Sequence, residues 1–382
     1  MTILFGHPTG NPNSHQAALA HFEAGRLEAF CVPWMPSALA LRMLSAVPAL
    51  RPHAQRLARR RYEHLVDAPK IQGRLREWAR LASRVTGPSE QRVTQDANDW
   101  LMRTMQRECH RHAVTAVHAY EDCSLLPFEE AKRLGKACIY DMPIGYYPAW
   151  QDLQSELARR YADWLPVRYG AADEQVRLDR KRREMELADS VLVPCRFAEE
   201  TIRRFFPSKP IVLAPYGVDL DFWTPAGQRP PSEKLRFIFA GQLSLRKGIP
   251  GLIEAWQKAG LRDAELELVG SWHLSGAMRR SLPTGIAHRP PCDPATLRER
   301  YRAADVTVFT SFFEGFGLAL VEGMACGLPA LASDTSIAPE IVTPACGQVV
   351  PAGDIDALVA ALRFFGARRG ELRDMGRIAR AQ

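Results

Sequence analysis

Two carboxylates flank a glycine-rich turn in the segment EGFGLALVEGMACGLPAL, which starts at Glu314. Glu314 follows the predicted strand VTVFTS (306–311), and Glu322 lies in the first turns of a helix that apolar residues at helical spacing predict. Free amides and the positive dipole end at Gly317 and Leu318 favour a phosphate, whereas carboxylates accept hydrogen bonds from sugar hydroxyls. The pattern therefore predicts a ligand with both groups, such as a nucleotide sugar. The alternative is that Glu322 only stabilises the helix dipole and Glu314 is a surface residue.

A second loop, FAGQLSLRKGI (239–249), also has a composition suited to anions. The predicted strand ends at Gly241, and Arg246 and Lys247 precede the next helix. Adjacent cations at a helix start oppose the helix dipole, so they are unfavourable as structure alone, but they are favourable beside a phosphate. A third loop, FGHPTGNPNSH (5–15), has glycines that let amides approach a ligand, although such a sequence is also typical of an ordinary turn.

These loops belong to a chain in which predicted strands alternate with predicted helices, which is typical of parallel sheets with helices on both faces. In the first half we expect strands at 2–5, 29–34, 113–120 and 189–194, another strand ending within 137–146, and helices at 16–25, about 52–82 and 174–187. In the second half we expect strands at 235–241, 265–270 and 306–311, and helices at 248–259, 297–304 and 356–365. The proline-rich segment 205–219 marks a crossover. We predict an α/β fold with two Rossmann-like, doubly wound domains, residues 1–205 and 206–382.

Composition excludes several classes of protein. The chain has 382 residues, a net charge of +7 and 46% hydrophobic residues, which suffices for two hydrophobic cores. No stretch approaches the roughly 20 apolar residues of a membrane span, and the start MTILFGHPTG differs from a secretory signal. Eight cysteines without CxxC pairs favour incidental thiols in a reducing compartment over a disulfide framework or a zinc site.

Positive charge is concentrated in RPHAQRLARRRY (51–62), which holds five arginines. This segment is either a solvated helix face or a surface attracted to an anionic membrane or acceptor. The apolar segment before it, PSALALRMLSAVPAL (36–50), is too short to span a bilayer and is either core or interfacial. Because no basic and aromatic motif repeats along the chain, we do not expect nucleic-acid binding. Peripheral membrane contact remains among the expected interactions.

The acid-x7-acid pair from Glu314 to Glu322, the upstream AGQLSLRKG and the intervening APYGVDLDFWTP (214–225) resemble the GT4 family of retaining glycosyltransferases. The resemblance covers about residues 191–350 and is weak over the first 190. It implies the GT-B fold, in which an N-terminal acceptor-binding domain and a C-terminal donor-binding domain face each other across a cleft. It also implies transfer of a sugar from a nucleoside diphosphate sugar to a hydroxyl of a glycan, glycolipid or other acceptor, with no metal or other cofactor. The expected setting is bacterial polysaccharide or glycolipid synthesis in the cytoplasm, at the inner face of the membrane.

The resemblance also implies roles for individual residues. Lys247 contacts the donor phosphates with Arg246 as a helper, Glu314 holds hydroxyls of the transferred sugar, and Glu322 accepts from the ribose hydroxyls. The expected catalytic residues are Glu314, Lys247 and Asp141. The expected donor-binding residues are Gly10, Gly241, Gln242, Arg246, Lys247, Glu314, Phe316, Gly317, Leu318 and Glu322.

Three features depart from the family pattern. Gln242 stands where the family often has arginine, so Arg246 is expected to compensate for the missing charge. The DxD of Asp219 and Asp221 follows a Tyr-Gly turn, so we interpret it as an interdomain loop rather than a metal site. The family usually continues with a helix that returns to the N-terminal domain; this sequence stops at Gln382, which leaves a natural end and a truncation both open.

A further departure concerns the histidine-aspartate pair that many members carry near the reacting sugar carbon. The nearest equivalent here is Tyr140 followed by Asp141, and we assign the polar role to Asp141 rather than to Tyr140. His118 and Glu121 are the reserves, and a cap or turn role for Asp141 is the alternative. Two other functions stay open: another GT-B enzyme such as a nucleotide-sugar epimerase or a phosphorylase, and a non-catalytic nucleotide-sugar binding subunit.

Overall fold

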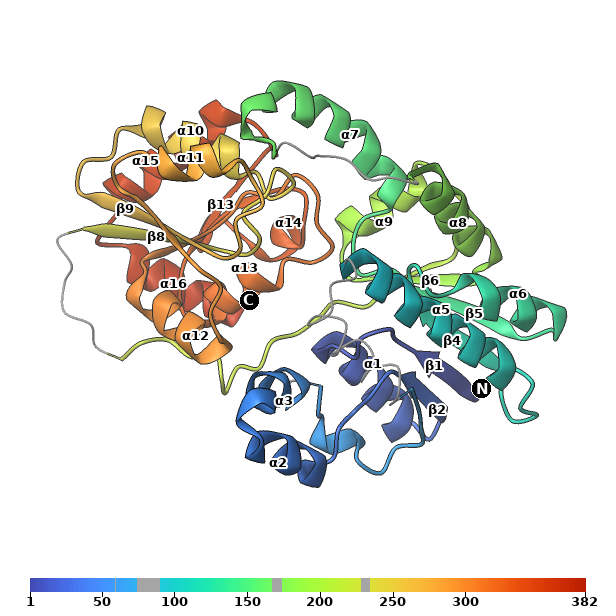
Figure 1. Ribbon diagram of the computed structural model, residues 1–382. Coiled ribbons are helices and arrows are strands. Elements are labelled where there is room, and N and C mark those ends of the chain that lie inside the picture. The colour runs from blue at the N-terminus through green and yellow to red at the C-terminus, as the bar shows by residue number, and fades with distance from the viewer. Residues whose placement is uncertain (59, 74–89, 167–173, 228–233) are drawn as a thin grey trace. The chain divides into compact units, whose positions relative to one another are not determined.

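The computed structural model describes residues 1–58, 60–73, 90–166, 174–227 and 234–382 (Figure 1). The chain groups into two compact units that interleave along the sequence. Unit 1 comprises Met1–Pro143, Asp173–Leu192 and Ser208–Val212, and unit 2 comprises Ile144–Ala172, Val193–Pro207 and Leu213–Gln382. The functional domains expected at 1–205 and 206–382 stay a prediction, because compact units and functional domains are different divisions of a chain.

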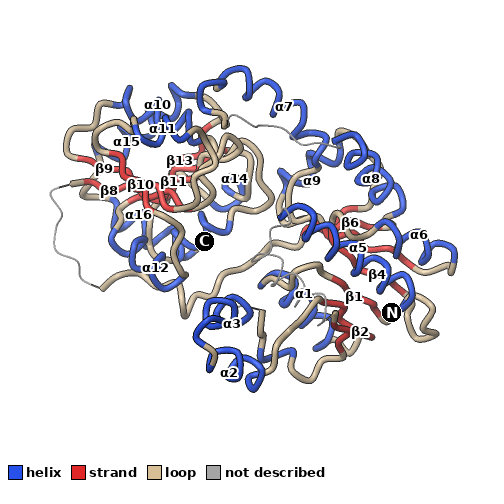
Figure 2. The backbone as a smooth tube through the Cα atoms, in the orientation of Figure 1, coloured by secondary structure: helices blue, strands red, loops and turns tan. Residues whose placement is uncertain are grey.

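The N-terminal sheet has seven strands in the order β3-β2-β1-β4-β5-β6-β7 (Figure 2). Its strands are β1 (Ile3–Gly6), β2 (Leu27–Val32), β3 (Lys70–Gln72), β4 (Ala116–Tyr120), β5 (Ala137–Asp141), β6 (Ser190–Val193) and β7 (Ile211–Leu213). The helices of unit 1 are α1 (Pro12–Glu23), α2 (Ala38–Ala46), α3 (Arg51–Ala58), α5 (Glu90–Glu108), α6 (Leu125–Arg133) and α8 (Glu174–Leu187), with 3-10 turns η1 (Pro48–Leu50) and η2 (Glu63–Leu65). Strands β1 and β4 are buried along their whole length, because helices cover both faces of a parallel sheet.

The C-terminal sheet has six strands in the order β10-β9-β8-β11-β12-β13. Its strands are β8 (Leu235–Ala240), β9 (Ala264–Val269), β10 (Ile286–Arg289), β11 (Val306–Phe309), β12 (Ala330–Ser333) and β13 (Gly347–Val350). The helices of unit 2 are α7 (Tyr147–Arg160), α9 (Arg196–Arg203), α10 (Ile249–Ala259), α11 (Gly276–Arg280), α12 (Pro294–Ala303), α13 (Leu318–Ala325), α14 (Ala338–Ile341), α15 (Ile355–Ala367) and α16 (Leu372–Ala381), with the 3-10 turn η3 (Ala162–Trp164). Figure 1 shows α10, α11 and α15 on one face of the sheet and α12 and α16 on the other, which is the three-layer arrangement of an α/β unit.

Helix α7 packs on the core of unit 2 although it precedes residue 205. Its residues Trp150 and Leu157 are buried in one cluster with β8, β11 and α15 residues. The sequence analysis predicted no helix in this region.

Both sheets reverse their strand order once, between β1 and β4 and between β8 and β11. In open parallel sheets, ligands bind beyond the carboxyl ends of the strands at such a reversal. In unit 2, the loops that leave β8 and β11 are those that carry Lys247 and Glu314. The fold therefore puts these two predicted site loops next to each other.

The predicted α/β class is confirmed, and the expected helix at 174–187 is observed as α8. The helix expected over about 52–82 is wrong beyond its first part, since α3 ends at Ala58 and β3 pairs with β2 at Lys70–Gln72. Pro69 favours an end of the helix before β3, because the residue before a proline is disfavoured in a helix. Residues 74–82 of the predicted helix lie outside the described part of the chain. Among the helices that the structure describes, none is both long and apolar enough to cross a bilayer.

Candidate functional site

A glycine brings the loops after β8 and β11 into contact. Gly248 has φ +71° at the N-cap of α10, and a Cβ there would lie 2.0 Å from the carbonyl oxygen of Thr310, so only glycine fits. Beside it, Thr310 Oγ1 donates to the Lys247 carbonyl at 3.1 Å, and the Phe312 amide donates to the Arg246 carbonyl at 2.8 Å. These contacts fix the backbone of Arg246 and Lys247 against the loop that follows β11.

The side chains of these loops form one charged cluster. Lys247 Nζ and Glu314 Oε2 form an ion pair, and both side chains are only 13% exposed. Arg246 Nη1 lies 3.5 Å from the same oxygen and donates to the Phe313 carbonyl at 2.7 Å. Ser311 Oγ donates to Glu314 Oε2 at 3.3 Å. The structure thus brings together Arg246, Lys247 and Glu314, three of the residues that the sequence placed in a donor site, and adds Ser311, which the sequence analysis had not selected.

Burial and charge act in opposite directions on this cluster. Burial raises the pKa of Glu314, but Lys247 and Arg246 lower it by more, so the net pKa lies below its usual value. Burial lowers the pKa of Lys247, Glu314 raises it and Arg246 lowers it, with a net decrease. Glu314 is therefore ionised at neutral pH. Two cations against one carboxylate leave a surplus positive charge, which favours an anionic ligand.

The N-terminus of α13 follows the same loop. Gly317 is its N-cap with φ +102°, and the amides of Leu320 and Val321 donate to the Gly317 carbonyl at 2.9 and 3.3 Å. Within the described residues, the amides of Gly317, Leu318 and Ala319 donate no hydrogen bond. Such amides are suitable donors for a phosphate. The phosphate-binding role expected for Gly317 and Leu318 stays a prediction, and their amides are available for it.

Glu322 lies in the second turn of α13, within the first turns in which the sequence placed it. Among the described residues, its carboxylate has no hydrogen-bond or ion-pair partner. Burial raises the pKa of Glu322 to about 7. The nearby Tyr301 hydroxyl donates instead to the Ala319 carbonyl at 2.8 Å. A partly buried carboxyl group with unused acceptors can accept hydrogen bonds from a hydroxyl-bearing ligand.

The remaining predicted residues of unit 2 lie in the same two loops. Phe316 is 5% exposed, and its ring meets that of Tyr216 with centroids 5.5 Å apart. Gly241 has φ +149°, and its carbonyl lies so close to Gly270 that a Cβ on Gly270 would be 1.7 Å away. The next residue, Gln242, is exposed, so its amide group is accessible to a ligand.

Gly10 lies in unit 1, in the loop after β1. It has φ +63°, and its amide donates to Nδ1 of His7 at 2.9 Å, as the Thr9 amide does at 3.1 Å. Burial, followed by the charges of His15 and Arg60, lowers the pKa of His7 to about 3. A neutral imidazole therefore holds this loop, and Gly10 is separate from the unit 2 cluster in the division into compact units.

Asp141 ends strand β5 of unit 1, and its carboxylate contacts His118, one of the two alternative residues from the sequence analysis. Asp141 Oδ2 lies 3.3 Å from Nε2 of His118, and Nδ1 of His118 lies 2.9 Å from Nε2 of His21. Burial lowers the pKa of His21 to about 4, and the His118 and Arg26 charges act in the same direction. The structure thus connects the preferred residue Asp141 with His118 and with His21, which the sequence did not single out because it lies on a different element, α1.

Tyr140 and Glu121 belong to a different polar cluster in unit 1. The Tyr140 hydroxyl donates to Glu184 at 3.0 Å, and Glu121 pairs with Lys181 at 2.7 Å. Glu184 also accepts from the Ser124 amide at 3.1 Å, next to the start of α6. These buried contacts join α8 to the sheet and to α6. The choice of Asp141 over Tyr140 stays a prediction.

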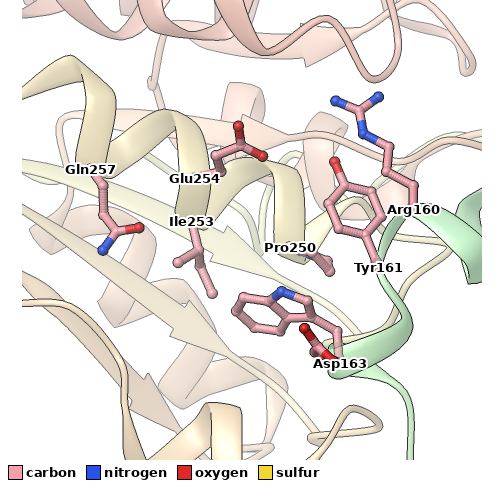
Figure 3. A pocket seen from close by; sticks show the side chains of 8 residues that line it. Arg160, Tyr161, Asp163, Pro250, Ile253, Glu254 and Gln257 are labelled. Carbon is pink, nitrogen blue, oxygen red and sulfur yellow. The ribbon is translucent and has the colours of Figure 1, made fainter.

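Two other features lie apart from the charged cluster. Asp219 Oδ1 accepts from the amides of Asp221 and Phe222 at 2.9 and 3.0 Å, so the DxD carboxylate closes a turn. A pocket of about 420 Å³ lies between the end of α7 and one face of α10 (Figure 3). It is lined by Arg160, Tyr161, Asp163, Trp164, Pro250, Ile253, Glu254 and Gln257 and by none of the predicted site residues.

Comparisons of sequence match part of this chain. The family described as Glycosyl transferases group 1 matches residues 224–382. A D-inositol 3-phosphate glycosyltransferase of Arthrobacter sp. (strain FB24) is 34% identical over 192 residues, 44% of this chain and 45% of the relative. A second relative is the GDP-mannose-dependent monoacylated alpha-(1-6)-phosphatidylinositol monomannoside mannosyltransferase of Corynebacterium glutamicum. It is 33% identical over 188 residues, which cover 42% of this chain and 49% of the relative. The matches span about half the length of these relatives.

Solved structures match the whole chain. Sucrose-phosphate synthase from Thermosynechococcus elongatus has a TM-score of 0.67 and 19% identity, covering 100% of this chain and 93% of its own. Anabaena Alr3699/HepE, solved in complex with UDP-glucose, has a TM-score of 0.61 and 16% identity, covering 100% and 94%. At such identities the likeness shows the fold. Residues 224–382 therefore match the model of the group 1 glycosyltransferases, and the chain as a whole has the two-domain GT-B fold.

Proposed function

We propose that this protein is a retaining glycosyltransferase that moves a sugar from a nucleoside diphosphate sugar to an acceptor hydroxyl. The observation that carries the proposal is the cluster of Arg246, Lys247 and Glu314, which lies where the strand order reverses between β8 and β11. It combines surplus positive charge with a carboxylate inside the family-matched region. A ligand with phosphates and hydroxyls satisfies both.

In the proposed reaction, the bond between the sugar carbon and the diphosphate oxygen breaks, and a bond from that carbon to the acceptor oxygen forms on the same face. The acceptor proton goes to the leaving diphosphate. Lys247, Arg246 and the free amides at Gly317 and Leu318 stabilise the charge that the diphosphate gains, so we propose no metal ion or other cofactor. Glu314 is engaged by two cations and has a lowered pKa, which suits a group that holds sugar hydroxyls better than a nucleophile or a base.

We assign the remaining predicted residues supporting roles. Glu322 accepts from the ribose hydroxyls, and Asp141, oriented by His118, is the proposed catalytic residue of unit 1. Substitution of His118 by asparagine tests this positioning role, because it removes the 3.3 Å contact to Asp141.

The acceptor is proposed to be a glycan or glycolipid. This assignment is supported by the names of relatives, which include the phosphatidylinositol mannoside enzyme and an O-antigen chain mannosyltransferase B of Escherichia coli, 29% identical over 200 residues. We propose that the protein acts in bacterial polysaccharide or glycolipid synthesis, in the cytoplasm at the inner face of the membrane.

A thermal-shift panel of UDP-, GDP- and ADP-sugars tests the donor class. We expect one nucleotide to raise the unfolding midpoint, by mass action on the native state, and the other two to have little effect. Turnover with that donor requires an acceptor; hydrolysis or isomerisation without one would favour an epimerase. Binding with no turnover in the presence of acceptor extracts would favour a non-catalytic subunit, and no shift with any of the three would contradict the proposal.

The raised pKa of Glu322 predicts a pH-dependent nucleotide affinity. With a pKa of about 7, the carboxyl group is largely protonated at pH 6 and ionised at pH 8, and the ionised form accepts stronger hydrogen bonds from the ribose hydroxyls. Affinity for the selected nucleoside diphosphate, measured by calorimetry, should therefore rise from pH 6 to pH 8.

Glu322→Gln is the matched control for this rise. The nucleotide phosphates titrate equally with both proteins, so the difference between them isolates residue 322. We expect the variant to bind at least about 10-fold more weakly at pH 8, as a lost charged hydrogen bond costs about 1.5–3 kcal/mol, and to show a flatter profile. The same profile in both proteins would exclude the ribose role.

A further inference from the structure

Helix α2 exposes an apolar face to solvent. Leu39 and Met43 are 68% and 66% exposed, and their spacing of four residues puts them on one side of the helix. Val47, which directly follows the helix, is 46% exposed. The opposite side is anchored, because Leu44 is buried in a small cluster with Trp34, Ala54 and Leu57. Ser37 caps the start of the helix by accepting from the Ala40 amide at 3.2 Å. The apolar face therefore belongs to a formed and anchored helix rather than to a loose segment.

The surroundings of this face are positive. Residues 29–62 contain six arginines and no aspartate or glutamate, whereas 43 acids in 382 residues would give about four in a stretch of 34. Arg42 is exposed on α2 itself. Arg51 is exposed at the start of α3, and its Nε donates to the Ser45 carbonyl at 3.0 Å, which holds it at the end of α2. Figure 1 shows α2 and α3 side by side.

We infer that α2 and the start of α3 form a docking surface for an anionic lipid bilayer. Leu39, Met43 and Val47 enter the boundary between headgroups and acyl chains, and Arg42 and Arg51 meet lipid phosphates. A helix of nine residues cannot span a bilayer, but apolar side chains beside exposed basic side chains are the combination that holds a helix in the membrane interface. Residues 29–62 contain no aspartate or glutamate that the lipid phosphates would repel. This charge pattern favours an anionic bilayer over a neutral one as the partner.

Contact of this surface with a membrane would bring the protein to a lipid-linked acceptor. This purpose of the membrane contact rests on the proposed function. An enzyme that glycosylates a lipid-linked acceptor gains from residence at the surface where the acceptor is concentrated, because binding in two dimensions raises the effective acceptor concentration. Vesicle binding itself needs neither donor nor turnover, so the two proposals can fail separately.

Co-sedimentation of the full chain with vesicles tests the inference. Vesicles of phosphatidylcholine with about one third phosphatidylglycerol should bind the protein at least about 10-fold more strongly than vesicles of phosphatidylcholine alone, and 0.5 M salt should weaken the binding. Leu39→Glu combined with Met43→Glu should lower the partition coefficient by about 10-fold or more, since it replaces inserted apolar side chains by anions.

Val176→Glu is the matched control, because Val176 is 69% exposed on α8 of the same unit. It should bind vesicles as the unaltered protein does. Both variants should keep the unfolding midpoint and the donor-induced shift, since exposed side chains contribute little to the fold. Equal binding to neutral and anionic vesicles, unchanged binding of the double variant, or concentration-dependent dimerisation abolished by that variant in place of vesicle binding would overturn the inference.

Discussion

Lys247→Met is expected to weaken donor binding about 100-fold, because removing one member of a buried charge pair costs about 2–5 kcal/mol. Lys247 is 13% exposed and its ammonium lies against Glu314. The variant loses the cation that a donor phosphate would contact and leaves Glu314 with Arg246 at 3.5 Å as its remaining ion-pair partner. The surplus positive charge of the cluster disappears, so phosphate is no longer favoured. Calorimetric titration with the nucleoside diphosphate chosen by the thermal-shift panel measures the effect.

Lys258→Met provides the comparison. Lys258 lies on α10, pairs with Glu254 at 2.8 Å and has a 53% exposed side chain. An exposed pair of this kind contributes little to stability, so donor affinity and stability should stay close to those of the unaltered protein. If Lys247→Met and Lys258→Met titrate alike, Lys247 has no phosphate role, and the proposed donor site would have to be abandoned.

Glu314→Gln is expected to lower turnover about 100-fold, which corresponds to about 2.7 kcal/mol of lost transition-state stabilisation. Glutamine keeps the shape of the side chain but accepts weaker hydrogen bonds from the sugar hydroxyls. The same change frees Lys247 and Arg246 from a competing carboxylate. The affinity for the nucleoside diphosphate without its sugar should therefore stay the same or increase, which separates this variant from Lys247→Met.

Steady-state kinetics together with product titration distinguish these outcomes. Glu265→Gln is a suitable control, because Glu265 lies on β9, pairs with Arg236 at 2.7 Å and is 39% exposed outside the cluster. Small and equal losses for Glu314→Gln and Glu322→Gln would contradict the division of labour between sugar and ribose. A large loss of nucleoside diphosphate affinity in Glu314→Gln would show that the carboxylate organises the phosphate site instead.

Part of this site was accessible from the sequence because its residues stand at fixed places in local patterns. Lys247 precedes a predicted helix and Glu314 follows a predicted strand, and in a parallel sheet both positions fall at the carboxyl edge of the strands. The roles of Gly10, Gln242 and Phe316 stay predictions in the same sense, since only their positions in the loops are given by the structure. The pairing of Asp141 with His118 and His21 had no such signal, because the three residues lie on three different elements.

The sequence by itself determined the α/β class, the two series of strands and helices, and the residue types that flank the carboxyl ends of β8 and β11. It could do so because hydrophobic periodicity and turn residues are encoded over a few neighbouring positions. Only the tertiary structure decided that β8 and β11 are neighbours, so that Lys247 and Glu314, 67 residues apart, form an ion pair. It also decided that α7 packs on unit 2 and that Leu39 and Met43 face solvent. Strand order, helix assignment and exposure depend on which distant surfaces are buried together, and no local pattern carries that information.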